Sequence, residues 1–247
     1  SSKVNTMKIY SKVVIVMGIF FGFSSGCEAQ RDPGPGDRPP VVAGRFYPGT
    51  EKELRNTLKG LFAAAVPRQS GDVRAIITPH AGYIYSGKVA ASGYNQVDRE
   101  RSYERVFVIA SSHHSSFGGA SVFNSGDYIT PLGRVSVDTA LANRLIEEHN
   151  VFSFQPEADR KEHSLEVQVP FLQYHHGKEF TLVPVIIGTQ SEQVCRKIAE
   201  ALRPWFNERN LFVISTDFSH YPSYDDAVTA DRATCEAIVS GSPETLK

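Results

Sequence analysis

The sequence predicts an α/β fold in which a mixed central sheet carries helices on both faces. Short apolar runs that are typical of buried strands alternate with longer amphipathic stretches that are typical of helices. The 247 residues are 41% hydrophobic and 21% charged, and they show no internal repeat. This composition excludes a disordered or collagen-like chain. The length favours one large domain, or at most two small ones, with a substantial core.

Local signals mark the expected helices. Thr50 and Glu53 form a capping box at the start of the first one. Asp138 can cap a later helix, and Pro170 is expected to kink or restart another. Apolar residues at helical spacing follow these signals. The expected helices span residues 50–65, 88–97, 138–146, 164–174, 191–202 and 225–239.

The expected strands are short and mostly apolar on both faces, as strands buried on both sides are. The first one ends at Pro79, a residue that cannot continue a sheet ladder. Residues 122–137 are β-rich and contain a turn at Thr130-Pro131-Leu132-Gly133. The buried strands are expected at residues 75–78, 106–110, 182–187 and 211–216.

The first forty residues differ from the rest of the chain. Met7 is the expected start, and Lys8 and Lys12 precede an apolar run at 13–23 that suits a signal-peptide core and is too short for a permanent membrane span. Small residues then lead to Cys27, which resembles the lipobox of bacterial lipoproteins, where the cysteine is lipidated. We therefore expect an exported lipoprotein that reaches the membrane only through a lipid anchor on Cys27. The alternative is a plain secretory signal and a periplasmic or secreted protein.

The expected domain follows this leader, which covers residues 1–27. Residues 28–40 are rich in Pro and Gly and are expected to form an extended tether. The folded domain is expected from Val41 to Lys247. Near its end, Ser242-Pro243-Glu244 is a helix start signal with only three residues after it. We therefore expect the chain to stop within a domain.

Charge and cysteine usage exclude two classes of function. The 26 Lys and Arg nearly balance the 27 Asp and Glu, giving a net charge of −1, so nucleic acid is not an expected partner. The three cysteines share no close spacing, which excludes a disulfide framework and a zinc site of the CxxC type. Cys195 and Cys235 fall within expected helices, where we expect small core residues.

Three histidine-bearing loops each follow an expected strand, and they contain His80, His113 and His220. In open α/β sheets, ligands bind outside the carboxyl ends of the strands, so these loops are expected to converge there. Imidazole is the commonest protein ligand for zinc, iron and copper. The three loops therefore predict a metal or catalytic cluster. For any one loop taken alone, a histidine that satisfies nearby backbone groups is the simpler interpretation.

A fourth histidine cluster, at residues 162–166, lies at a helix start. His163 and Glu166 are three residues apart and are expected to share a face. They could orient a metal ligand or a substrate by hydrogen bonds, without binding the metal themselves. The alternative is a capping arrangement with Glu162 at the positive end of the helix. His175-His176 looks like a solvated helix end and is assigned no role.

Five motifs follow one another along the chain: Val42-Ala43-Gly44-Arg45-Phe46-Tyr47-Pro48, Pro79-His80-Ala81-Gly82-Tyr83, Ser112-His113-His114, Glu162-His163-Ser164-Leu165-Glu166 and Asp217-Phe218-Ser219-His220. Taken together, they resemble the ordered motifs of the Memo family, whose bacterial members are called AmmeMemoRadiSam system protein B. The resemblance covers Val41 to Lys247.

This resemblance implies a fold similar to class III extradiol dioxygenases of the LigB type, in which two histidines and a carboxylate hold iron(II). In Memo proteins a similar site has two histidines and a cysteine. The resemblance places the two histidine ligands at His80 and His113. It places the base-like histidine at His220, with Asp217 beside it. The ligand cysteine of the family would come after Lys247, so the third ligand is expected beyond this chain.

Three functions are compatible with these residues. The first is a redox enzyme of the dioxygenase type that uses iron or copper at His80 and His113, with His220 moving the proton. The second is a non-catalytic module on the same fold that binds a small ligand, a peptide or a partner protein. The third is a zinc hydrolase, which three histidines permit but no HExxH motif supports.

Overall fold

The computed structural model describes residues 33–177 and 180–241. The leader with Cys27, the first part of the tether and the helix start at Ser242 lie outside these residues. Among the residues described, no helix combines the length and the apolar character needed to cross a membrane.

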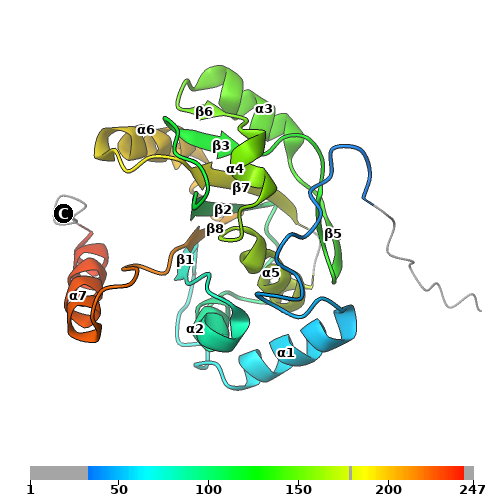
Figure 1. The fold of residues 1–247 in the computed structure, drawn as a ribbon, viewed down its shortest axis with the longest axis vertical. Coiled ribbons are helices and arrows are strands. Elements are labelled where there is room, and N and C mark those ends of the chain that lie inside the picture. Colours follow the sequence, from blue (N-terminus) through cyan, green and yellow to red (C-terminus); the bar gives the residue numbers. More distant parts are fainter. Residues whose placement is uncertain (1–32, 178–179, 242–247) are drawn as a thin grey trace, which may run out of the picture. The chain divides into compact units, whose positions relative to one another are not determined.

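A six-stranded mixed sheet forms the centre of the domain (Figure 1). The first four strands in spatial order are parallel, β3 runs antiparallel to β7, and β6 pairs in parallel with β3. This confirms the predicted α/β class with a mixed sheet. In spatial order the strands are β1 (Ala75–Thr78), β8 (Asn210–Ser215), β2 (Arg105–Ser111), β7 (Thr181–Ile187), β3 (Ala120–Val122) and β6 (Phe152–Ser153).

The register of the parallel strands aligns three strand ends at one edge of the sheet. Ser215, at the end of β8, pairs with Thr78 of β1 on one side and with Ala110 of β2 on the other. Strand β8 therefore lies between β1 and β2. The loops that follow these three strands leave the sheet side by side.

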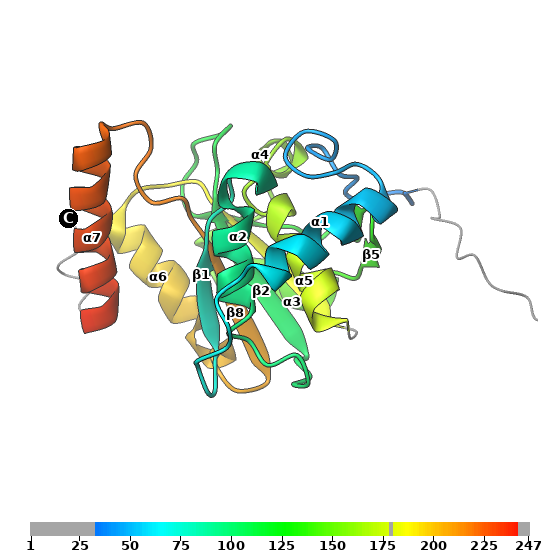
Figure 2. The same cartoon turned by 90° about the horizontal axis from the view of Figure 1, so that it is seen from below.

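Helices cover both faces of the sheet (Figures 1 and 2), as predicted. On one face lie α1 (Glu51–Ala63), α2 (Tyr83–Tyr94) and α5 (Val169–His176), and on the other lie α3 (Thr139–Glu148) and α6 (Glu192–Leu202). The side chains of a strand point alternately to the two faces, so the central strands β8, β2 and β7 contribute to two separate cores.

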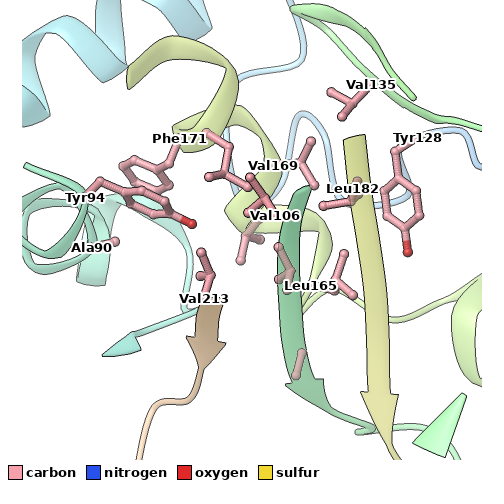
Figure 3. Close-up of a cluster of buried hydrophobic side chains, with 14 of the residues drawn as sticks. Ala90, Tyr94, Val106, Tyr128, Val135, Leu165, Val169, Phe171, Leu182 and Val213 are labelled. Carbon is pink, nitrogen blue, oxygen red and sulfur yellow. The ribbon is translucent and has the colours of Figure 1, made fainter. Parts of the chain in front are cut away.

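Strand β2 shows this division directly. Val106 belongs to the core under α1, α2 and α5, whereas the next residue, Phe107, belongs to the core under α3 and α6. Figure 3 shows the first core, where Tyr94 of α2 and Phe171 of α5 stack with ring centroids 5.3 Å apart. Burial of such apolar surface, at roughly 25 cal/mol per Å², is the main force that fixes these helices on the sheet.

The local signals read from the sequence mostly hold. Thr50 caps α1 and Asp138 caps α3, each accepting a backbone N–H with its side chain. Pro170 stands in the first turn of α5, directly after a short 3-10 helix at Glu166–Gln168, so the predicted restart is confirmed. The predicted turn at 130–133 joins the small hairpin of β4 (Tyr128–Thr130) and β5 (Gly133–Val135).

Some elements differ from the prediction. Helix α2 begins at Tyr83, five residues before the expected Lys88, because the carbonyl of Phe46, far away in the sequence, accepts its first N–H at 2.8 Å. The short elements β6, α4 (Pro156–Arg160) and a 3-10 turn at Arg203–Trp205 were not predicted. Two to five residues are too few to show a periodic pattern.

Two expectations about burial are wrong. His175 and His176 are 3% and 6% exposed rather than solvated, because the rings of Phe62 and Tyr103 pack against them at 5.1 and 5.3 Å. Cys235 is exposed rather than part of a core, since its helix α7 (Tyr224–Ser240) buries little beyond Ala237; Cys195 in α6 is half-buried.

Candidate functional site

The three histidine loops meet at the edge of the sheet. His80 follows β1, His113 follows β2 and His220 follows β8. The ring of His80 lies 5.1 Å from that of His113 and 6.4 Å from that of His220, and the last two are 5.9 Å apart. One nitrogen of each ring lies within 4.8 Å of one nitrogen of each of the other two rings. The convergence expected of loops that follow strand ends is thus present.

His80 is the most buried member of this cluster, at 2% exposure. Its backbone N–H donates to Asp217 Oδ1 at 2.5 Å, and its Nδ1 lies 3.0 Å from the hydroxyl of Ser215. Its Nε2 is buried and has no hydrogen-bond partner within the described part of the chain. Asp217 Oδ2, at 3.6 Å, is too far for a hydrogen bond.

Burial also sets the charge of this ring. Burial disfavours the imidazolium and lowers the pKa of His80 to about 4, although the Asp217 carboxylate acts in the opposite direction. His80 is therefore neutral at pH 7, which is the form of imidazole that binds metals.

His113 is held by a buried carboxylate, that of Glu162. Glu162 Oε1 lies 2.9 Å from His113 Nδ1, and Oε2 accepts the backbone N–H of His113 at 2.6 Å. The hydrogen bond to Glu162 raises the pKa of His113 above its ordinary value. Burial alone would raise the pKa of Glu162, but the hydrogen bonds that it accepts lower it to about 2, so the carboxylate is ionised.

The sequence predicts only a capping role for Glu162. It does accept the backbone N–H groups of His163 and Ser164, both at 3.0 Å, so the capping arrangement is present. The contact with His113, 49 residues away, was not foreseen. The sequence did contain a signal for this contact. Glu162 is an acidic residue directly before a histidine, and it had no predicted role besides capping.

His163 lies at the side of the cluster. Its ring is 4.5 Å from that of His113 and 5.7 Å from that of His80, and Phe46 packs on it at 4.7 Å. With Glu162 and His113 it forms a second group of possible metal-binding atoms. Glu162, however, already accepts four hydrogen bonds there, so it has little capacity left for an ion.

Glu166 does not share the environment of His163, in contrast to the expectation. Its carboxylate binds Arg38 at 2.8 Å, the hydroxyl of Tyr47 at 2.7 Å, and the N–H groups of Val41 and Val42. We call residues 38–47 the N-terminal strap. The 3-10 turn at Glu166–Gln168, rather than a regular helix, directs Glu166 to this strap.

Arg38 falls within the predicted tether, but it is 4% exposed and is part of the domain. Besides Glu166, its guanidinium binds the backbone carbonyls of Asp159 and Glu162, at 3.1 and 2.5 Å. The N-terminal strap therefore supports the segment that carries Glu162. This support could not be read from a Pro- and Gly-rich stretch of sequence.

His220 is exposed, as is His113, whereas His80 is buried. The Nδ1 of His220 lies 3.0 Å from the carbonyl of Phe218. Phe218 and Tyr221, on either side, have φ values of 60° and 61°, a left-handed conformation that costs non-glycine residues about 1–2 kcal/mol each.

Asp217, expected beside His220, makes its hydrogen bond to His80. His114, the neighbour of His113, is exposed, and its ring is 6.3 Å from that of His163.

A cavity of about 720 Å³ lies away from this cluster, at the amino ends of β2 and β7. Arg55 and Arg134 line it, but Arg55 pairs with Glu51 at 2.7 Å and Arg134 pairs with Asp37 at 2.7 Å. Because these charges are already compensated, the cavity offers less to an anion than its arginines suggest.

Comparison with known proteins agrees with the motifs. The family model of Memo-like proteins matches residues 38–247. A MEMO1 family protein from Thermoplasma acidophilum is 38% identical over 204 residues, which cover 81% of this chain and 73% of that protein. Similar proteins from Methanopyrus kandleri and Ignicoccus hospitalis are both 35% identical, over 83% and 85% of this chain and 76% and 78% of their own lengths.

Proposed function

The chain belongs to the family of Memo-like proteins, and from this premise we propose that it binds a divalent metal ion at the edge of the sheet through His80 and His113. One observation carries the proposal. His80 Nε2 is buried and lacks a hydrogen-bond partner among the described residues, and His80 belongs to a cluster in which one ring nitrogen each of His80, His113 and His220 lie within 4.8 Å of one another. A buried polar atom without a partner costs about 1–3 kcal/mol unless something else satisfies it.

The donor set suits a transition metal. Imidazole nitrogen binds iron, copper and zinc, whereas magnesium and calcium prefer oxygen ligands. We propose iron or copper, and zinc is the alternative. A bound iron or copper ion would supply redox chemistry toward dioxygen. The function proposed is therefore a metal-dependent oxidoreductase of the dioxygenase type, acting on a small phenolic compound.

The chain's own residues have separate tasks in this proposal. His80 and His113 hold the ion, and Asp217 fixes the loop of His80 through its backbone N–H. We assign His220 the proton rather than the metal, as the resemblance to the dioxygenases implies. The carbonyl of Phe218 engages its Nδ1, which leaves Nε2 free to act as the base. An exposed imidazole at the mouth of the site can exchange protons with both a substrate and the solvent.

The experiment compares the whole protein with a His220→Gln variant. Metal content is measured after loading with Fe(II) or Cu(II), and oxygen uptake is measured with catechol-like compounds. Removal of a general acid–base group typically lowers the rate by about 10²–10⁴-fold. We expect His220→Gln to keep its metal and to lose turnover by this factor.

Two results would contradict the proposal in different ways. Loss of metal in His220→Gln would make His220 a ligand and would favour the three-histidine zinc site of a hydrolase. Metal binding by the wild type with no turnover of any compound, and only weakened ligand binding in the variant, would favour the non-catalytic binding module.

A further inference from the structure

The hydroxyl of Ser215 determines where the proton of His80 lies. Ser215 Oγ has three close partners: the carbonyl of Ser164 at 2.6 Å, Gln168 Nε2 at 2.8 Å and His80 Nδ1 at 3.0 Å. A hydroxyl has one proton to donate, and a carbonyl oxygen can only accept. The proton of Ser215 must therefore point to Ser164, since two oxygens 2.6 Å apart would otherwise repel each other. His80 Nδ1 is left as the donor to Ser215.

The orientation of the Gln168 amide supports this assignment. Its Nε2 also donates to the carbonyl of Pro79 at 2.9 Å, and its Oε1 accepts the hydroxyls of Thr78 and Tyr94 at 3.0 and 2.9 Å. The reverse orientation would place the NH₂ group against two hydroxyls and the oxygen against a carbonyl. The amide thus donates to Ser215. This network is almost fully buried, and Gln168 and Ser215 are 0% and 2% exposed.

Glu162 determines which ring nitrogen of His113 carries the proton. An ionised carboxylate can only accept hydrogen bonds. His113 Nδ1, which lies 2.9 Å from Glu162 Oε1, must therefore carry a proton. The two backbone N–H groups that also bind Oε1 hold the carboxylate in place, so it cannot turn away from the ring.

We infer that Ser215 and Glu162 are positioning residues that hold His80 and His113 with the proton on Nδ1 and leave both Nε2 lone pairs free for a ligand in the metal-free protein. Free histidine in water prefers the proton on Nε2, so the protein selects the tautomer that is less populated in solution. The inference about the protons stands on the hydrogen bonds alone. Its consequence for metal affinity rests on the proposed function.

Ser215 and Glu162 differ in charge, and this difference makes the two histidines unequal as ligands to a metal. His80 is backed by a neutral hydroxyl and His113 by a carboxylate. A carboxylate behind an imidazole makes that ring a more basic ligand. The metal would therefore meet one ordinary and one strengthened imidazole.

The test uses nitrogen-15 NMR of the histidine rings in the whole, metal-free protein. Spectra are recorded at about pH 9, well above the ordinary imidazole pKa of about 6.5, so that the rings are neutral. Signals are assigned with His80→Asn and His113→Asn variants. We expect both rings to show protonated Nδ1 and unprotonated Nε2. Protonated Nε2 on either ring in the wild type would overturn the inference for that ring.

Substitutions then identify the residues responsible. Ser215→Ala should shift His80 toward the Nε2–H form, and Glu162→Ala should do the same for His113. Ser215→Thr and Glu162→Gln keep an acceptor oxygen and should retain the Nδ1–H form, which separates this role from a general loss of packing. Ser121→Ala is the matched control, because Ser121 is also fully buried but binds Asp159 instead of a histidine. It should leave both rings unchanged.

A metal titration of the same variants is measured separately. Residues that orient metal ligands typically change metal affinity by about 10–100-fold, and we expect a loss of this size in Ser215→Ala and Glu162→Ala. If the wild type binds no metal but shows both Nδ1–H rings, the proposed function fails and the tautomer inference stands. If the wild type binds metal and Ser215→Ala and Glu162→Ala leave both tautomers unchanged, the roles of Ser215 and Glu162 are wrong.

Discussion

His80 and His175 are buried to the same degree, but they lie in regions with different tasks. They are 2% and 3% exposed, and burial lowers the pKa of each to about 4. His80 stands at the carboxyl end of β1, where its Nε2 is without a hydrogen bond in the described residues. His175 lies in the last turn of α5, and its Nε2 is 3.0 Å from the carbonyl of Val97.

The difference lies in which lone pair is free. A carbonyl can only accept, so His175 carries its proton on Nε2, opposite to the arrangement inferred for His80. The ring of His175 stacks on Phe62 at an interplanar angle of 14° and serves the packing of α5 against α1. Burial keeps a histidine neutral, but only a nitrogen that no other group has satisfied makes it a candidate ligand.

The largest expected effect separates these two residues by metal affinity. Four-ligand structural zinc sites bind with about 10–16 kcal/mol, so one ligand contributes about 3–4 kcal/mol and its loss lowers affinity roughly 10²–10³-fold. We expect this loss in His80→Ala and no change in His175→Ala, measured by calorimetric titration of the metal. Both variants lose a buried ring, which makes the second a matched control for the first. Equal losses of affinity would show that burial, and not the free nitrogen, is what matters.

The next prediction tests the property that His80 and His175 share, which is a pKa lowered by burial. The pKa of His175 is about 4 in the folded protein and 6.5 in an unfolded chain. As the pH falls, the unfolded chain binds the proton first, so the stability due to neutral His175 is complete above about pH 6.5 and is lost toward pH 4. The shift corresponds to about 3 kcal/mol at most.

A His175→Phe variant should therefore lose less stability than the wild type between about pH 7 and pH 4, by up to this amount. The measurement is urea unfolding at a series of pH values. The variant will be less stable overall, since the carbonyl of Val97 loses its donor. The decisive quantity is the slope of the free energy of unfolding against pH. An unchanged slope would mean that His175 is not held neutral in the folded protein.

The smallest expected effect concerns His114. It follows His113 directly, but the groups of possible metal-binding atoms found among the described residues include His113 without His114. His114→Ala should change metal affinity by less than about twofold, against roughly 10²–10³-fold for loss of a ligand. Equilibrium titration of both alanine variants provides the comparison. A larger effect of His114 would reverse their assignment.

The sequence predicts the parts of this site that depend on local patterns. Apolar runs reveal the strands, and the residue after each strand end is expected at one edge of the sheet. That is why the convergence of His80, His113 and His220 is predictable from topology. The burial of His175 is not predictable in this way, because it arises from a ring of α1 that packs over the end of α5.

The supports behind the ligands are less predictable for a different reason. Ser215 is 135 residues from His80, and Glu162 is 49 residues from His113. Each contact depends on the orientation of one side chain in the finished fold, and neither serine nor glutamate has a spacing rule at such separations. An acidic residue in a histidine motif was a hint for Glu162. For Ser215 and Gln168 we see no local signal.

The ion pair between Arg38 and Glu166 has a consequence for the order of events in folding. These residues are 128 positions apart, so their pairing closes one of the longest loops in the domain. Long loops close late, since the chain must give up more entropy before the contact forms. The same guanidinium binds the carbonyl of Glu162. On the ribosome, the segment that backs His113 therefore cannot reach its final form until the chain has been synthesised well beyond residue 166, and the site is completed with the whole domain rather than loop by loop.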